Sequence, residues 1–187
     1  MKKILFCLSL ILLLLVPCSC TQKSDMTENL YDFTFKLDNQ TYTLPESISA
    51  FTDNGWSFPE DYNDFDYIVK YGNLKSTYLS KGDNWFNIEI FNYEKQDKPL
   101  KDCPIGRVTY DFSGEVKVTT AGGYELNNKT LNEIKNKYGE PFSEAKYGNY
   151  IEVIYDKDPE KSTYDRYTFR FDLSNEVIEY IDINYFA

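Results

Sequence analysis

The chain has 187 residues, with 20 Lys or Arg, 30 Asp or Glu and no histidine, so its formal charge at pH 7 is −10. This acidic balance argues against nucleic acid as a partner and against direct binding to anionic lipid headgroups. The missing histidine excludes Ser-His and Cys-His catalysis and the commonest zinc sites. The sequence also lacks a glycine-rich phosphate loop, so we expect no cofactor.

The first 19 residues are organised like an export signal. Lys2 and Lys3 precede an apolar core over residues 4–16. This core is shorter than the roughly 20 residues that a membrane-spanning helix needs, but it suits a secretory signal. It ends in the segment LVPCSC, residues 15–20, which resembles the lipobox of bacterial lipoproteins. In that family a cysteine receives a diacylglyceryl group through its sulfur.

Two cysteines compete for this lipid. Cys20 follows Ser19, a small residue that the lipobox accepts, whereas Cys18 follows Pro17, which it does not. Leu15, three positions before Cys18, favours the other choice. We predict lipidation at Cys20, with Cys18 as the second choice. The resemblance implies a protein held in the cell membrane by a diacylglyceryl anchor, stable because it carries two chains, and facing the extracytoplasmic side.

Removal of residues 1–19 takes away two lysines and no acidic residue, so the mature chain has a charge of −12. Lipidation of Cys20 leaves Cys103 without a cysteine partner, and we predict Cys103 as a small buried residue outside any disulfide. Lipidation of Cys18 would instead leave Cys20 and Cys103 available for a bridge.

Residues 20–30 are polar and without hydrophobic period, which predicts a tether. The apolar alternation of Phe33, Phe35 and Leu37 before a turn at residues 38–40 then predicts a hairpin.

A first short helix is predicted from Thr43, because Thr43 and Glu46 have capping-box spacing and Pro45 would occupy the first turn. Further strands are predicted at residues 67–71, 76–80, 85–93, 105–112 and 115–119. We predict Trp56 and Trp85 as core residues.

Gly122 and Gly123 mark a joint between two halves of the chain. Beyond it, Thr130 and Glu133 form a second capping-box pair, and Gly139 ends the second predicted helix. Three strands with one covered side complete the chain, at residues 150–155, 164–171 and 177–185, with a possible change of face between Tyr180 and Ile181.

These elements predict an α+β fold in which short helices pack on antiparallel sheet. The expected units are residues 31–119 and a helix plus three strands over residues 120–187. Both helices begin Thr-Leu-x-Glu and carry an aromatic residue eight positions later, Phe51 or Tyr138. This favours two tandem helix-plus-sheet units, although a chance recurrence of the capping box is the alternative.

Residues 126–141, with a helix ending Lys-Tyr-Gly-Glu-Pro, resemble the small lipoproteins of the SmpA/OmlA outer-membrane assembly type. They also resemble the tandem units of the secreted β-lactamase inhibitor protein, over about residues 120–187. The opening Leu37-Asp38, Tyr42, Leu44-Pro45 and Gly55-Trp56 is similar to uncharacterised lipoproteins of low-GC Gram-positive bacteria. These resemblances imply an interaction scaffold rather than an enzyme; the long first half departs from the outer-membrane type.

An acidic loop at residues 60–66 is the candidate for a cation site. Hard oxygen ligands for Ca²⁺ would come from Asp61, Asn63, Asp64 and Asp66. The loop lacks the central glycine and the distal glutamate of an EF-hand, so a solvated acidic loop is the preferred interpretation and we assign no metal ligand.

We therefore predict an exported, lipid-anchored cell-surface protein that binds another envelope or extracellular protein and is not an enzyme. An open sheet face carrying tyrosines is the candidate surface, although no partner-binding residue is assigned. The alternatives are a small-ligand or Ca²⁺-binding lipoprotein that uses residues 60–66, and a carboxylate-dependent hydrolase. No catalytic residue is assigned.

Overall fold

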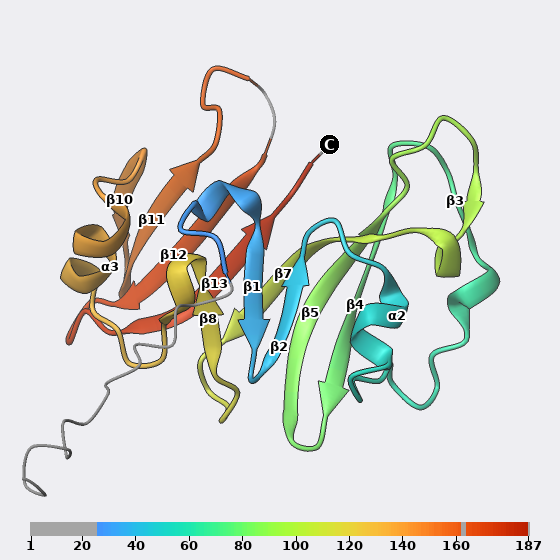
Figure 1. The fold of residues 1–187 in the computed structure, drawn as a ribbon, viewed down its shortest axis with the longest axis horizontal. Helices are drawn as coiled ribbons and strands as arrows, with labels where there is room; N and C mark the ends of the chain where they lie inside the picture. The colour runs from blue at the N-terminus through green and yellow to red at the C-terminus, as the bar shows by residue number, and fades with distance from the viewer. Residues whose placement is uncertain (1–25, 162–163, 187) are drawn as a thin grey trace, which may run out of the picture.

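A computed structural model describes residues 26–161 and 164–186 (Figure 1). Most of these residues lie in antiparallel sheets, and the two α-helices are short, so the fold is compatible with α+β but richer in strand than the sequence indicated. A seven-stranded sheet has the order β10-β11-β12-β13-β7-β5-β4. Its strands are β4 (Leu74–Lys81), β5 (Asn84–Phe91), β7 (Ile105–Asp111), β10 (Ser143–Tyr147), β11 (Tyr150–Asp156), β12 (Arg166–Asp172) and β13 (Ile178–Asn184).

Smaller elements lie beside this sheet. A four-stranded sheet has the order β2-β1-β8-β9, and β3 pairs with β6. The strands are β1 (Thr34–Leu37), β2 (Gln40–Thr43), β3 (Ile68–Val69), β6 (Lys98–Pro99), β8 (Val118–Thr120) and β9 (Tyr124–Glu125). The helices are α2 (Ile48–Thr52) and α3 (Leu131–Tyr138), with 3-10 turns η2 (Leu30–Asp32), η3 (Asp64–Asp66), η4 (Leu100–Asp102) and η5 (Ala121–Gly123).

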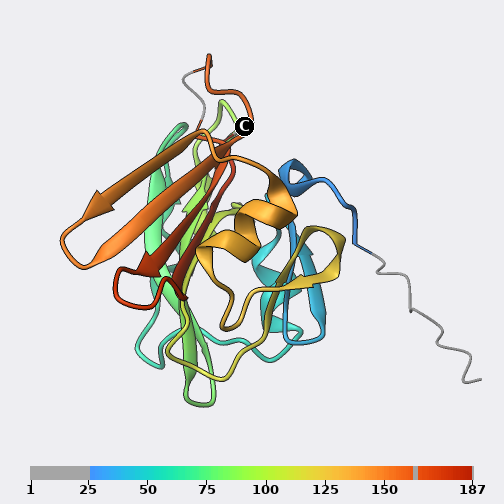
Figure 2. The ribbon, with the colours of Figure 1, turned by 90° about the vertical axis from the view of Figure 1, so that its left-hand side faces the viewer.

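The small four-stranded sheet and α3 cover one side of the seven-stranded sheet, as the side view in Figure 2 shows. The core lies between these layers. Phe51 of α2 is fully buried, stacked on Tyr42 with ring centroids 4.1 Å apart, and it also contacts Phe86 of β5. Burial of one such side chain contributes about 1.5–3 kcal/mol. We call this side of the large sheet the covered face and the opposite side the open face.

The two halves of the chain meet in the middle of the large sheet, where β13 pairs antiparallel with β7. Ile181 lies opposite Tyr110, and Ile183 lies opposite Val108; all four are buried. The expected boundary between residues 119 and 120 falls inside β8, which itself pairs with β1. The seven-stranded and the four-stranded sheets therefore each contain strands from both halves of the chain.

The predicted capping box of Thr43 and Glu46 is wrong. Thr43 ends β2, and the backbone of Glu46 pairs with Ile105 through two hydrogen bonds of 2.9 and 2.7 Å. The helix begins only at Ile48, where the Ser47 hydroxyl accepts from the N–H of Ala50 at 3.2 Å. A long-range backbone pairing uses the residues that local spacing had placed in the first helical turn.

The capping box of α3 is confirmed. The Thr130 hydroxyl accepts from the N–H of Glu133, and the Glu133 carboxylate accepts from the N–H of Thr130 at 3.0 Å. Lys129 adds an ion pair of 3.0 Å to the same carboxylate. The backbone hydrogen bond from Thr130, followed by the one from Lys129, lowers the pKa of Glu133 to about 2.

After α3 the structure has four strands, one more than predicted. β10 has the sequence Ser-Glu-Ala-Lys-Tyr and was missed because it carries almost no apolar alternation. It is an edge strand that pairs only with β11 among the described residues. The last strand does change face, but at Glu179 rather than between Tyr180 and Ile181: Phe171 lies opposite Ile178 and Arg170 lies opposite Tyr180, which leaves Glu179 without a residue opposite it in β12.

The capping carboxylate predicts acid-sensitive stability. Because the pKa of Glu133 is lower in the folded chain than its ordinary value of 4.5, its contribution is present above pH 4.5 and is lost as the pH falls through about 2. Glu133→Gln should lower the thermal midpoint at pH 7, and the difference from the parent should vanish near pH 2. Thermal melts at several pH values measure this. The exposed Glu115→Gln is the control, and an equal effect from it would contradict the assignment.

Candidate functional site

The open face is the surface on which the sequence had placed a partner. Along β5 and β7, buried residues such as Phe86 and Val108 alternate with residues on the opposite side. Polar and aromatic residues on this side include Tyr78, Trp85, Asn87, Glu89, Arg107, Thr109, Asp111, Tyr150, Glu152, Arg170, Tyr180 and Asp182.

Arg107 is the centre of a charged cluster on this face. Its guanidinium binds Asp182 with two hydrogen bonds, 2.7 Å from Nε and 2.8 Å from Nη2, and Glu89 with a third of 3.0 Å from Nη1. The Asp182 side chain is only 5% exposed and also accepts from the Thr109 hydroxyl. The hydrogen bonds to Asp182 raise the pKa of Arg107, which stays charged. Bidentate pairs of this kind are both strong and directional.

Arg170 forms a second cluster towards the other end of the sheet. Its Nε binds Glu152 at 2.8 Å. The guanidinium carbon also lies 4.9 Å from the ring centre of Tyr150 and 4.5 Å from that of Tyr180. Stacking on two rings restricts the arginine and the tyrosines together. The Arg170, Tyr150 and Tyr180 side chains therefore hold one another in place on the open face.

An exposed aromatic pair stands at the β4–β5 end of the face. The rings of Tyr78 and Trp85 are 6.5 Å apart and nearly perpendicular, with 41% and 48% of each residue exposed. The prediction that Trp85 is a core residue is wrong, because Phe86 takes the inward position of β5. The same prediction for Trp56 is confirmed, since Trp56 is 2% exposed against Phe86.

Two shallow hollows flank this pair. One of about 460 Å³ is lined by Ser80, Asp83, Asn84 and Trp85, and one of about 390 Å³ is lined by Asn87, Glu89, Arg107 and Thr109. Tyr78 borders both. Both hollows are thus lined by exposed rings and by hydrogen-bonding side chains. A further hollow of about 530 Å³ lies apart from this face, lined by residues of α2, η3 and η4.

The acidic loop does not gather its candidate ligands. Asp64 forms an ion pair with Lys75 at 2.8 Å, and Asp66 forms one with Lys101 at 2.7 Å. Asp61 and Asn63 are exposed. Over residues 26–161 and 164–186, no three Asp, Glu, Cys or His side chains come together as a cation site.

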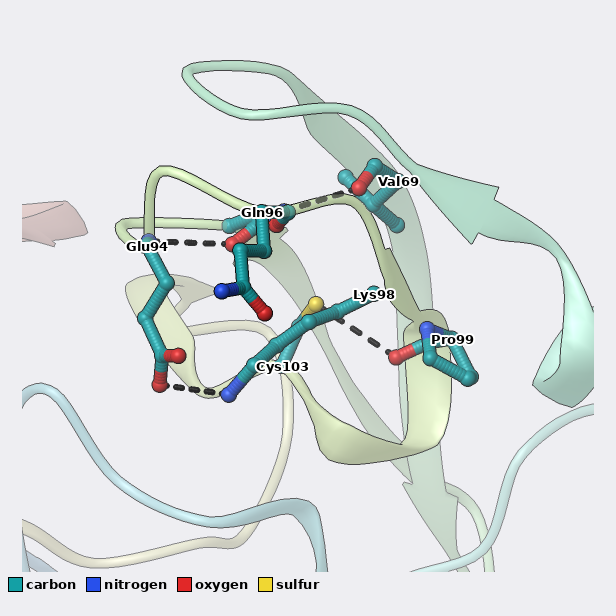
Figure 3. A network of polar contacts seen from close by, with 7 residues as sticks. Val69, Glu94, Gln96, Lys98, Pro99 and Cys103 are labelled. Carbon is teal, nitrogen blue, oxygen red and sulfur yellow. Dashed lines mark hydrogen bonds and ion pairs between the residues drawn. The ribbon is translucent and has the colours of Figure 1, made fainter.

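Cys103 is buried, as predicted, and its thiol lies 3.5 Å from the Pro99 carbonyl oxygen (Figure 3). Burial raises the pKa of this thiol, which makes it a poor nucleophile. The two candidate lipidation sites, Cys18 and Cys20, lie outside the described residues. Within the described residues, no helix has the length and apolar character to cross a membrane.

The contacts of Arg107 predict that replacing its side chain lowers the stability of the fold substantially. Arg107→Gln should lower the free energy of unfolding by about 3 kcal/mol, because it leaves the Asp182 carboxylate buried without a counter-charge. Urea denaturation measures this. The control Lys101→Gln, which removes an ion pair between two exposed side chains, should leave the stability nearly unchanged. Similar losses in both variants would show that burial of Asp182 does not decide the effect.

Comparison with known proteins gives no match: no family model, no curated protein and no solved structure matches the chain. The resemblance to SmpA/OmlA-type lipoproteins therefore stays a prediction.

Proposed function

We propose that this protein is exported, anchored by lipid at Cys20, and binds another envelope or extracellular protein with its open face. The observation that carries the proposal is the exposed pair Tyr78 and Trp85 on a sheet in which Arg107 and Arg170 are already held by carboxylates. Tyrosine, tryptophan and arginine are enriched at protein interfaces and among the residues that dominate binding energy. A rigid surface also loses little conformational entropy on association.

The position of the first described residues supports this arrangement. Thr27 accepts a backbone hydrogen bond of 2.6 Å from Gly122, and Glu28 forms an ion pair of 3.0 Å with Lys137 of α3. These contacts lie on the covered side, away from the open face (Figure 2). Met26 lies six positions after Cys20, and six extended residues span at most about 20 Å. A lipid on Cys20 would thus hold the covered side towards the membrane.

We further propose that the two halves are related units. Each helix uses its distal aromatic residue to contact the large sheet: Phe51 lies 5.8 Å from Phe86 of β5, and Tyr138 lies 6.4 Å from Phe169 of β12. The last strand that each half contributes to the large sheet, β7 or β13, then pairs with the other at the centre.

The anchor predicts a release phenotype. Cys20→Ala should move most of the protein from the cell fraction into the medium, because the diacylglyceryl chains can no longer be attached. Cys18→Ala should stay with the cells and is the matched control. Immunoblots of cells and medium measure this, and release by Cys18→Ala alone would assign the lipid to Cys18.

The open face predicts position-dependent crosslinking. A photo-crosslinking amino acid at Asn87, exposed on the open face, should yield a discrete adduct on intact cells. The same amino acid at Asn132, exposed on α3, should yield none. Trp85→Ala should abolish the adduct from position 87. Equal adducts from both positions, or none from position 87, would contradict binding through the open face.

A further inference from the structure

The seven-stranded sheet ends in two outer strands, β4 and β10, and their outer edges differ. On β4, Ser57 pairs with Ser80 through two backbone hydrogen bonds of 2.9 and 2.8 Å, which occupies part of that edge. On β10, residues 143–147 form no backbone hydrogen bond with any described residue outside β11. The tip of the β10–β11 hairpin also projects beyond the neighbouring strands in Figure 2. A further strand can therefore add to the sheet at β10.

The turn of this hairpin decides which backbone groups of β10 face outwards. The two-residue turn 148–149 connects Tyr147 to Tyr150, which lie opposite each other. Such a turn closes on a hydrogen-bonded pair, and bonded and non-bonded pairs then alternate along the two strands. The N–H and C=O groups of Glu144 and Lys146 are therefore directed away from β11, towards the open edge.

The side chains of these two residues carry opposite charges and lie on the covered side. They stand opposite the buried Val153 and Ile151 of β11. Glu144 binds Lys135 of α3 at 2.5 Å, whereas Lys146 is exposed and has no ion pair with any residue in the described part of the chain. An edge with charges of one sign repels a copy of itself. An edge with Glu and Lys two positions apart matches its own antiparallel copy, because the copy presents the two charges in reverse order.

We propose that β10 pairs with β10 of a second copy of this chain, antiparallel and about a two-fold axis at Ala145. In this register Glu144 lies opposite Lys146 of the second copy, and Lys146 lies opposite its Glu144. Each of these pairs exchanges both of its backbone hydrogen bonds and brings opposite charges together. A two-fold contact of this kind closes after two copies, whereas joining β10 to β4 would build an open filament.

Phe142 adds an apolar contact to this interface. It directly precedes β10 and is 61% exposed. The same register brings Phe142 to the turn of the second copy, at Gly148. A Cβ atom at Gly148 would meet nothing within 4 Å, so space for the ring is available there. Aromatic side chains pack well over glycines of a neighbouring strand. The two-fold axis makes this contact twice.

The symmetry of the contact suits the lipid anchor, and this step alone rests on the proposed attachment at Cys20. A two-fold axis between antiparallel strands is perpendicular to the sheet, so the covered faces of both copies lie on the same side of the joined sheet. Two copies anchored in one membrane can thus pair while both open faces point outwards. One strand pair is a small interface, and anchoring in a shared membrane raises the effective concentration of the copies for each other.

Disulfide crosslinking of the full chain on intact cells tests the pairing. In Ala145→Cys the two introduced cysteines face each other as a non-hydrogen-bonded pair, with Cα atoms about 4.5 Å apart, which suits a disulfide. Oxidation with copper phenanthroline should give a covalent dimer on non-reducing immunoblots. Asn132→Cys, exposed on α3, is the matched control and should give roughly tenfold less dimer. The parent chain under the same oxidation reports any dimer through the native cysteines.

A second set of cysteines tests the register. Glu144→Cys should crosslink poorly with itself, because the two equivalent Cα atoms are about 9 Å apart in this register, beyond the reach of a disulfide. It should crosslink with Lys146→Cys when both variants are expressed in the same cells. More dimer from Glu144→Cys alone than from Ala145→Cys would overturn the proposed register.

Exchange of the charges tests their role, with Ala145→Cys present throughout. Glu144→Lys places like charges opposite each other and should reduce the dimer about tenfold. Combining Glu144→Lys with Lys146→Glu should restore the dimer, although both variants lose the ion pair with Lys135. Recovery therefore separates pairing between copies from the stability of the hairpin. If the exchange does not restore the dimer, or if positions 132 and 145 give equal amounts, β10 does not pair with itself.

Failure of this inference is distinguishable from failure of the proposed function. The adduct from position 87 reports binding at the open face, and the disulfide at position 145 reports pairing at the β10 edge. Loss of the disulfide with a persistent adduct refutes only the pairing of copies. Loss of the adduct with a persistent disulfide refutes only the binding function of the open face.

Discussion

The pairing of β7 with β13 is the interaction on which the rest of the structure depends. It joins segments such as those of Arg107 and Asp182, which lie 75 positions apart in the chain. On the covered side the pairing buries Ile181 and Ile183 beside Tyr110 and Val108. On the open side the same pairing places Arg107 against Asp182. Closing so long a loop is entropically costly, so the apolar contacts on one side must offset it before the polar cluster on the other can form.

The open face differs from an ordinary solvated sheet in how its charged side chains are paired. Arg107 and Arg170 are each held by carboxylates of neighbouring strands, and Arg170 is further stacked on two tyrosines. Side chains restrained in this way have less rotamer freedom to lose on binding. Asp83 and Asp111, beside the exposed pair Tyr78 and Trp85, have no ion pair with any residue in the described part of the chain. The arginines at the centre of the open face are thus restrained by ion pairs. The carboxylates of Asp83 and Asp111 have no such partner among the described residues.

Features that depend on nearby residues could be predicted from the sequence. The α3 capping box joins Thr130 to Glu133, and its sequence signal is as local as its hydrogen bonds. The α2 start could not be predicted, because Glu46 pairs with the distant Ile105. Trp85 and Phe86 are adjacent aromatic residues in one strand, so alternation requires one of them to face outwards but does not say which.

The Arg107 and Arg170 clusters of the open face could not be predicted from the sequence either. The alternation of apolar and polar residues assigns each side chain to a face of its strand, but it does not give the register between strands. Arg107 in the middle of a strand that alternates with buried residues was the available signal, since a largely buried arginine is usually paired with a carboxylate. The identity of that partner depends on which strand lies beside β7. Nothing near Arg107 in the sequence indicates that it is β13 rather than a strand of the same half.

The site where the chain enters the fold has a consequence for how neighbouring copies would meet. Thr27 and Glu28 are held on the covered side by Gly122 and Lys137. If the anchor is attached at Cys20, all copies in one bilayer would display their open faces outwards and in the same direction. Two such copies could not bring these faces together. Recognition through this surface would then occur in trans, with a molecule on an opposing surface or in the surrounding medium, rather than in cis among neighbours of the same membrane.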